Sequence, residues 1–193
     1  MNPRRQQHRQ SYNEFGHAHE LTFGCDRGFW FLERERVCNW LADAINKVRQ
    51  DQEMAIWAYV FMPNHVHLLI HFGCAEDNMA SVLKEMKWPV SRKALAYLRE
   101  HAHEWLPKLQ AQRGTKTETH FWQRGGGYDR NVTEPQTLEK MIQDIHLNPV
   151  RKGLVERATD WKWSSANWYA IGTGPIVIDR LPPEWTVGMT CDS

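Results

Sequence analysis

The sequence has few of the features that mark secreted, membrane or zinc-ribbon proteins. Its four cysteines, Cys25, Cys38, Cys74 and Cys191, are scattered with no CxxC spacing, which argues against a zinc ribbon or a disulfide framework. No apolar run approaches the roughly 20 residues that a membrane-spanning helix needs. The basic first residues have no apolar segment behind them. We therefore expect no signal peptide, no membrane partner and a cytoplasmic location.

The chain also has little net charge. It has 24 lysines and arginines and 23 acidic residues, so the formal charge is only +1 and composition alone does not indicate nucleic-acid binding. Any basic surface must come from the local arrangement of cations. The 193 residues fit one domain with appended segments. We expect a basic arm over residues 1–14, a domain over 15–170 and an irregular tail over 171–193, which is rich in proline and glycine.

Hydrophobic periodicity predicts a mixture of strands and helices. Strands are expected near residues 18–25, 54–62 and 65–72, and helices over about 33–50, 78–101 and 135–148. Met62-Pro63-Asn64 is expected to form a tight turn between the second and third strands. Pro89 should interrupt its helix, and residues 114–119 should form a polar loop. We expect these elements to share one compact core.

Two histidines, His65 and His67, lie two residues apart in a predicted strand. A strand sends every second side chain to the same face, so both imidazoles point one way while Val66, Leu68 and Ile70 point the other. A rigid sheet can thereby hold two neutral nitrogen ligands on one divalent metal. The alternative for either histidine alone is a structural side chain with satisfied hydrogen bonds. We refer to these two residues as the histidine pair.

Two other pairs of histidines have the same spacing in less suitable settings. His101 and His103 lie at the end of a predicted helix, where two residues turn the side chain by about 200° and rule out shared ligation. His17 and His19 precede a predicted strand but lack a long apolar frame. The histidine pair therefore ranks first as a metal site.

The helix predicted over residues 78–101 has a basic side. Its buried face is expected to consist of Met79, Leu83, Met86, Val90, Ala94 and Tyr97. The other side gathers a set that we call the basic rail, namely Lys84, Trp88, Arg92 and Arg99. Such a set suits single-stranded nucleic acid, because cations meet phosphates and the ring can stack on a base. The alternative is an ordinary solvated face.

A glycine run and a third helix follow. Gly125-Gly126-Gly127 can bring backbone close to a ligand or simply make a flexible loop. The third helix has an apolar stripe formed by Leu138, Met141, Ile142 and Ile145. Lys140, Asp144 and Asn148 follow at intervals of four on its flank. Helical geometry therefore places Asp144 and Asn148 side by side.

Three ordered blocks carry a resemblance to a known family. They are residues 62–69, 121–125 and 145–155, and the similarity continues through residues 161–165 to cover roughly 15–170. The chain resembles the REP-associated tyrosine transposases, which are bacterial members of the single-tyrosine HUH nuclease superfamily. This resemblance implies an α+β fold of ferredoxin-like HUH nuclease architecture, with helices packed on an antiparallel sheet.

The resemblance also implies a chemistry, a cofactor and a partner. A divalent metal, Mg or Mn, would polarise a phosphate of single-stranded or hairpin DNA, and a tyrosine would attack it to leave a 5′-phosphotyrosine link. The implied metal ligands are His65, His67 and Asn148. The expected DNA contacts are Lys84, Trp88, Arg92, Arg99, Arg124, Arg130, Arg151 and Lys152. The protein would act as a monomer or homodimer.

The chain departs from the family pattern at the nucleophile. Family members usually read Tyr-Ile-His before the Asn-Pro block, whereas this chain reads Asp144-Ile145-His146. Asp144 therefore takes the usual position of the catalytic tyrosine, where carboxylate attack would give a labile acyl phosphate. It could instead add a metal ligand or pair with Lys140. Tyr128 is the nearby substitute nucleophile, although Gly-Tyr-Asp is itself part of the family pattern.

Three functions are compatible with this pattern. The first is metal-dependent strand cleavage and transfer in DNA transposition. The second, favoured by Asp144, is a catalytically weakened protein that binds DNA hairpins on the same fold. The third is a metal-dependent phosphohydrolase for small phosphate esters, which predicts a deep closed pocket in place of an open basic groove.

Overall fold

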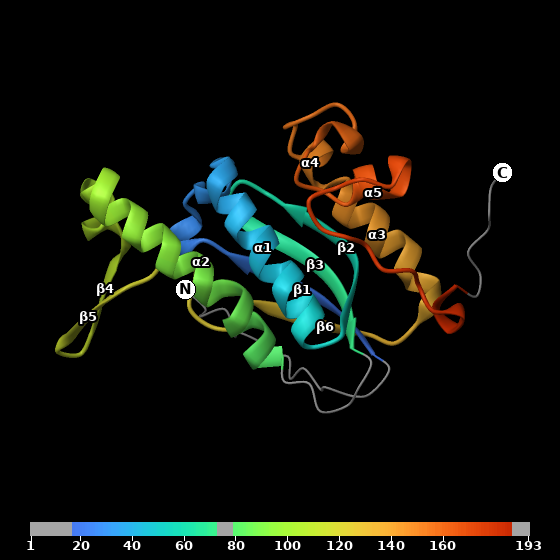
Figure 1. Cartoon of the computed structure of the whole chain (residues 1–193), viewed down its shortest axis with the longest axis horizontal. Helices are drawn as coiled ribbons and strands as arrows, with labels where there is room; N and C mark the ends of the chain where they lie inside the picture. The colour runs from blue at the N-terminus through green and yellow to red at the C-terminus, as the bar shows by residue number, and fades with distance from the viewer. Residues whose placement is uncertain (1–16, 73–78, 187–193) are drawn as a thin grey trace, which may run out of the picture.

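The computed structural model describes residues 17–72 and 79–186, and the predicted N-terminal arm lies outside them. At its centre is a four-stranded antiparallel sheet with the strand order β2-β3-β1-β6 (Figure 1). The strands are β1 (Ala18–Gly24), β2 (Met54–Phe61), β3 (His65–Phe72) and β6 (Tyr128–Val132). The α+β class and the antiparallel sheet predicted from the sequence are confirmed.

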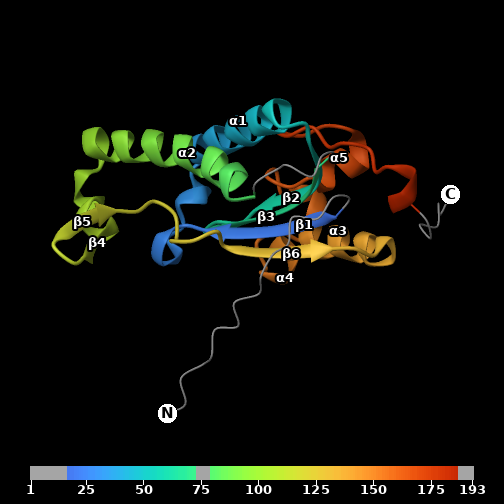
Figure 2. The ribbon, with the colours of Figure 1, turned by 90° about the horizontal axis from the view of Figure 1, so that it is seen from below.

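Helices cover both faces of this sheet. The helices α1 (Glu35–Asp51) and α2 (Met79–His101) pack on one face, and α3 (Leu138–His146) lies on the other (Figure 2). Strand alternation divides the core accordingly: Leu68 of β3 packs toward α1 and α2, whereas its neighbour Leu69 packs toward α3. His67 pairs with Val60, which is also in the α3 core, so the histidine pair lies on the α3 side.

The elements with clear hydrophobic periodicity match their predictions to within about two residues. The expected turn between β2 and β3 is present, because the Met62 backbone nitrogen donates to the carbonyl of His65 at 2.8 Å. The expected interruption at Pro89 is wrong, since α2 continues through it. Beyond Pro89 the buried positions are Val90, Ala94 and Leu98, and Tyr97 is only half-buried.

A β-hairpin replaces the polar loop expected over residues 114–119. Its strands are β4 (Gln110–Arg113) and β5 (Lys116–Thr119), and Gly114 turns between them with a φ of 60°. The hairpin projects from the body beside α2 (Figure 1). Its side chains are largely exposed, so the apolar alternation by which strands are predicted is absent.

The third predicted helix is shorter and divided. Pro135–Thr137 form a single 3-10 turn, α3 begins at Leu138, and α4 (Asn148–Arg151) follows after Leu147. The predicted apolar stripe of α3 is buried against the sheet, as expected. The break between the helices places Asn148 at the start of α4.

The segment after α5 (Ala166–Ile171) is irregular, as expected, but it packs firmly on the body. Ile176 and Ile178 join the core beneath α1 and α2, and Trp185 joins the core beneath α3. Asp179 accepts a hydrogen bond from the Ile56 backbone nitrogen at 2.9 Å. The packed body therefore extends past residue 170. No helix in residues 17–72 and 79–186 combines the length and apolarity needed to cross a bilayer.

Candidate metal site and DNA groove

The histidine pair is held in a defined orientation on the α3 side of the sheet. The two rings lie edge to face with centroids 4.9 Å apart. His65 Nδ1 lies 2.6 Å from Asn64 Oδ1, and His67 Nδ1 lies 2.9 Å from Thr22 Oγ1. When Nδ1–H donates to these oxygens, each ring presents the lone pair of Nε2 to a metal.

Burial keeps both imidazoles neutral. Desolvation lowers the pKa of His67 to about 4, and the proximity of His65 adds to the shift. Desolvation also lowers the pKa of His65, helped by the positive charge of Lys152. A neutral imidazole is the form that binds a metal ion, so these two side chains fit a divalent cation.

The proposed third ligand, Asn148, begins α4. Its Nδ2 donates to the carbonyl oxygens of Asp144 at 3.0 Å and Ile145 at 3.3 Å, which satisfies the last turn of α3. Its Oδ1 is the side-chain atom suited to a cation. Among the described residues, no three His, Cys, Asp or Glu side chains form a group that could hold a metal. A third protein ligand would therefore be of another type, such as an amide.

Asp144 forms an ion pair with Arg151, and not with Lys140, which was one of the alternatives considered for it. The guanidinium Nη2 of Arg151 donates to Asp144 Oδ1 at 2.6 Å. Asp144 also acts on Glu20 of β1: desolvation raises the pKa of Glu20, Arg130 opposes the shift, and Asp144 adds to it. The carboxylate that the sequence predicts at the position of the catalytic tyrosine is thus paired with a cation.

Tyr128 lies on the same face of the sheet as His67. Thr22 pairs with His67 on β3 and with Tyr128 on β6, and directly paired residues point the same way. The Tyr128 side chain is 42% exposed. Tyr128, the predicted substitute nucleophile, therefore lies on the same side of the sheet as the histidine pair, with β1 between them.

The glycine run before Tyr128 serves the packing of β6 on β1. Gly127 has a φ of +81°, and a Cβ atom there would lie 2.2 Å from the carbonyl oxygen of Thr22. The backbone at Gly127 therefore approaches strand β1 of the protein itself, and not a ligand.

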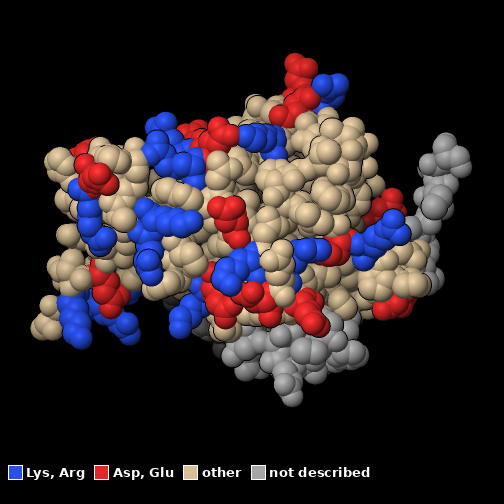
Figure 3. All heavy atoms as spheres, in the orientation of Figure 1, with Lys and Arg blue, Asp and Glu red and all other residues tan. Residues whose placement is uncertain are grey.

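The basic rail opens on a groove of about 630 Å³ between α2 and residues 119–126. All four rail residues line it, and Arg124 lines the opposite wall. Trp88 is 54% exposed, and the guanidinium of Arg92 lies 4.8 Å from its ring centroid. Lys and Arg side chains gather over α2 and the β4–β5 hairpin (Figure 3). The four residues gather on one side of α2 as predicted.

Lys87 is a groove cation that the sequence analysis misses. Its Nζ donates to the carbonyl oxygen of Gly125 at 3.1 Å, and burial lowers its pKa. Trp122 Nε1 donates to the carbonyl oxygen of Lys87 at 2.9 Å, which attaches the opposite wall to α2. The available signal was its spacing of three residues from Lys84, which places both on neighbouring positions of the helix surface.

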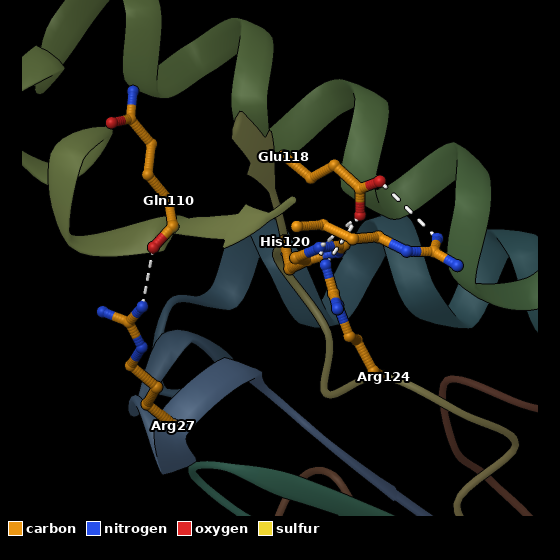
Figure 4. Close-up of polar contacts among 6 residues, drawn as sticks. Arg27, Gln110, Glu118, His120 and Arg124 are labelled. Atoms are coloured by element: carbon orange, nitrogen blue, oxygen red, sulfur yellow. Dashed lines mark hydrogen bonds and ion pairs between the residues drawn. The ribbon is translucent and has the colours of Figure 1, made fainter. Parts of the chain in front are cut away.

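Arg124 is fixed at the groove by the β4–β5 hairpin. Its Nη2 donates to Glu118 Oε2 at 2.7 Å and its Nε to His120 Nε2 at 3.0 Å (Figure 4). The hairpin is itself anchored, because Arg27 Nη2 donates to the carbonyl oxygen of Gln110 at 2.7 Å. The guanidinium is therefore held in one place before any ligand arrives.

Comparison with known proteins identifies the family. The family described as "Transposase IS200 like" matches residues 23–146. The chain belongs to this transposase family. A protein of Haemophilus influenzae classed as a REP-associated tyrosine transposase is 27% identical over 148 residues, which cover 71% of this chain and 77% of that protein. The REP-associated tyrosine transposase of Escherichia coli K12 is 23% identical over 125 residues, which cover 65% and 62%.

A solved structure of a REP-associated tyrosine transposase bound to a REP hairpin has the same fold. The TM-score is 0.66 at 21% identity, and the match covers 98% of this chain and 100% of the other. These matches confirm the resemblance that the three sequence blocks carry.

The remaining predicted DNA contacts lie apart from the groove, on the α3 side of the molecule. Arg130 of β6 pairs with Glu20 at 3.7 Å, and Arg151 of α4 pairs with Asp144. Lys152 lies close enough to His65 to lower its pKa. The eight predicted contacts thus form two groups, five at the α2 groove and three on the α3 side.

The lower-ranked histidines have structural partners. His19 is buried on the sheet face opposite the histidine pair, with Nδ1 3.0 Å from Asp129 Oδ1. His17 Nδ1 lies 3.2 Å from Asn131 Nδ2. His101 packs edge-on against Tyr97, with centroids 4.4 Å apart. Their lower ranking agrees with these contacts.

Proposed function

We propose that this transposase-family protein binds single-stranded or hairpin DNA in the α2 groove and places a phosphodiester beside a divalent cation at the histidine pair. The observation that carries the proposal is the pair of neutral imidazoles, each oriented through Nδ1 by a side chain of the same site. Family membership and the hairpin bound by the structural neighbour favour DNA over a small phosphate ester.

Each part of the site has a role in this proposal. A bound Mg²⁺ or Mn²⁺ would supply positive charge to a phosphate oxygen. Asn64 and Thr22 fix the tautomers and directions of the two imidazoles, and Asn148 Oδ1 is the proposed third ligand. These polar partners matter because a ligand that is already oriented loses little freedom when the ion binds.

The basic rail supplies the DNA contacts of the proposal. Its three cations and Arg124 would neutralise phosphates along the groove, while Trp88 offers a face on which a base can stack. Lys87 has its Nζ directed to Gly125, so its role is to hold the groove wall.

The second candidate function is hairpin binding with weakened cleavage. The specific observation is Asp144, whose carboxylate pairs with Arg151 where the family motif has its tyrosine. Attack by a carboxylate would leave an acyl phosphate that water hydrolyses, so no lasting link to DNA would form. In this version the protein retains DNA binding and the metal site, and Tyr128 is the candidate for any residual covalent attack.

One gel experiment separates these functions. Hairpin oligonucleotides labelled at the 5′ or 3′ end are incubated with the protein and Mn²⁺, and the products are resolved under native and denaturing conditions. We expect retarded hairpin without a covalent adduct. A hairpin that is not retarded at low salt, combined with metal-dependent hydrolysis of p-nitrophenyl phosphate, would refute the DNA proposal and support the phosphohydrolase.

A further inference from the structure

A second pocket lies on the other flank of α2 from the basic groove. It holds about 390 Å³, which is within the range of roughly 300–1,000 Å³ typical of small-ligand sites. Its walls come from α1, α2 and the 3-10 turns Phe31–Glu33 and His103–Trp105. We call it the aromatic pocket, after its lining residues Trp30, Phe31, Trp40, Tyr97, Trp105 and Phe121.

The aromatic walls pack against one another, and Trp30 at the pocket is exposed. Phe31 stacks on Phe121 with centroids 4.9 Å apart and an interplanar angle of 20°, and Trp105 packs edge-on against Phe31 at 5.4 Å. Trp30 at the pocket is 58% exposed. An exposed ring beside a preformed pocket offers a face on which a planar ligand can stack.

The charges at the pocket favour an anionic aromatic ligand. The lining includes Arg34 and Arg36 against a single acidic residue, Glu33. The guanidinium of Arg36 lies 3.9 Å above the Tyr97 ring. Aromatic faces interleaved with arginines are the pattern by which proteins hold unstacked nucleotides, with rings on the base and cations on the phosphate.

The pocket adjoins the proposed DNA groove, because Phe121 lines both. A strand lying along the basic rail would therefore pass close to the aromatic pocket. A small apolar ligand or a proline-rich peptide would use the rings but leave the two arginines without a role.

We propose that the aromatic pocket receives one unstacked nucleobase of the single strand bound in the α2 groove. The inference rests on the proposed function, because it needs the strand to be bound there. The base stacks on the Trp30 side of the pocket, and Arg34 or Arg36 contacts its phosphate. The pocket thereby selects DNA with an unpaired nucleotide next to the duplex over fully paired DNA.

Photocrosslinking with the full-length protein tests this proposal. 5-Iododeoxyuridine is placed in turn at each unpaired position of a hairpin oligonucleotide, and the crosslinked peptides are mapped by mass spectrometry. We expect one position to crosslink to Trp30, Tyr97 or Trp105. Trp30→Ala should remove that crosslink and weaken binding about tenfold, within the range for one stacked base. Ile171→Ala, a change at a 70% exposed side chain on α5, should leave both unchanged.

An abasic site at the crosslinking position gives a second readout. It should weaken wild-type binding about as much as Trp30→Ala does, and the two changes together should cost little more than either alone. Trp30→Phe retains a stacking ring and should restore most of the affinity, which separates stacking from misfolding.

The outcomes distinguish this inference from the proposed function. Crosslinks to Trp88 alone, with unchanged affinity for Trp30→Ala, would overturn the aromatic pocket and leave DNA binding in the groove intact. Additive losses from the abasic site and Trp30→Ala would also overturn it. Failure of wild-type protein to bind any hairpin would refute the proposed function itself.

Discussion

Gly127 should be the least replaceable glycine of its run. Its φ of +81° is left-handed, and a Cβ atom there would lie 2.2 Å from the Thr22 carbonyl oxygen. Gly125 has a similar φ of +89°, but a Cβ there meets nothing described within 4 Å. The two positions therefore share the same backbone strain and differ in the contact, which makes Gly125→Ala a matched control for Gly127→Ala.

The expected magnitudes follow from the shared backbone strain and the contact that only Gly127 makes. Gly125→Ala should cost only the left-handed conformation, about 1–2 kcal/mol of unfolding free energy. Gly127→Ala adds an overlap with backbone, which β6 can relieve only by moving away from β1 at the Thr22–Tyr128 pair. Losing one or two ladder hydrogen bonds at about 1 kcal/mol each brings its total to about 2–4 kcal/mol.

Urea unfolding followed by tryptophan fluorescence measures both losses, provided that the dependence on urea is the same in all variants. Equal losses for the two alanines would refute the claim that close approach to β1 fixes Gly127. Hairpin binding supplies a second check, since Gly125→Ala should bind as well as wild type. A stable Gly125→Ala protein without hairpin binding would show that the glycine run approaches DNA after all.

Three further predictions concern the site. Thr22→Val should lower Mn²⁺ affinity about tenfold in calorimetry while Thr22→Ser preserves it, because the hydroxyl orients His67. Equal Mn²⁺ affinities for the two variants would show that Thr22 does not orient His67. An Mn²⁺ affinity that stays unchanged when alanine replaces both members of the histidine pair would refute the metal site. Neutralising the three cations of the basic rail should weaken hairpin binding and reduce its dependence on salt concentration. A salt dependence identical to that of wild type would show that the rail is an ordinary solvated face that does not contact DNA. Asp144→Tyr should form a covalent DNA adduct that wild type lacks, as judged by mass spectrometry; a wild-type adduct at Tyr128 would instead show that the nucleophile has moved to β6.

The sequence predicts those elements of the fold whose buried residues form a recognisable apolar pattern. β1, β3, α1 and α2 each bury a regular face, and β2 is an apolar run that is buried at nearly every position, so their apolar patterns reveal them. The β4–β5 hairpin buries little and is held by distant contacts such as that of Arg27 to Gln110, which no local pattern records. The packing of residues 172–185 could not be predicted either, because apolar residues in an irregular segment do not recur at a regular spacing.

The same distinction applies to the candidate site. The histidine pair can be predicted because both candidate ligands lie on one strand, and the basic rail because its residues lie on one helix. Thr22 is not visible, since its contact with His67 depends on how β1 and β3 align. The ion pair of Asp144 with Arg151 spans the break between α3 and α4, so a continuous helix led instead to Lys140. Local geometry brings the candidate ligands together and places Asn64 beside His65, whereas tertiary pairing supplies Thr22, the partner that orients His67.

The packing of residues 172–185 has a consequence for how the protein is made. Ile176 and Ile178 complete one core and Trp185, with its ring 5.1 Å from that of Trp57, completes the other. Until these residues leave the ribosome, both apolar faces of the sheet are incompletely covered, and such surfaces are prone to aggregate. A message cut short near codon 170 would therefore yield a substrate for chaperones and proteases, not a smaller working protein.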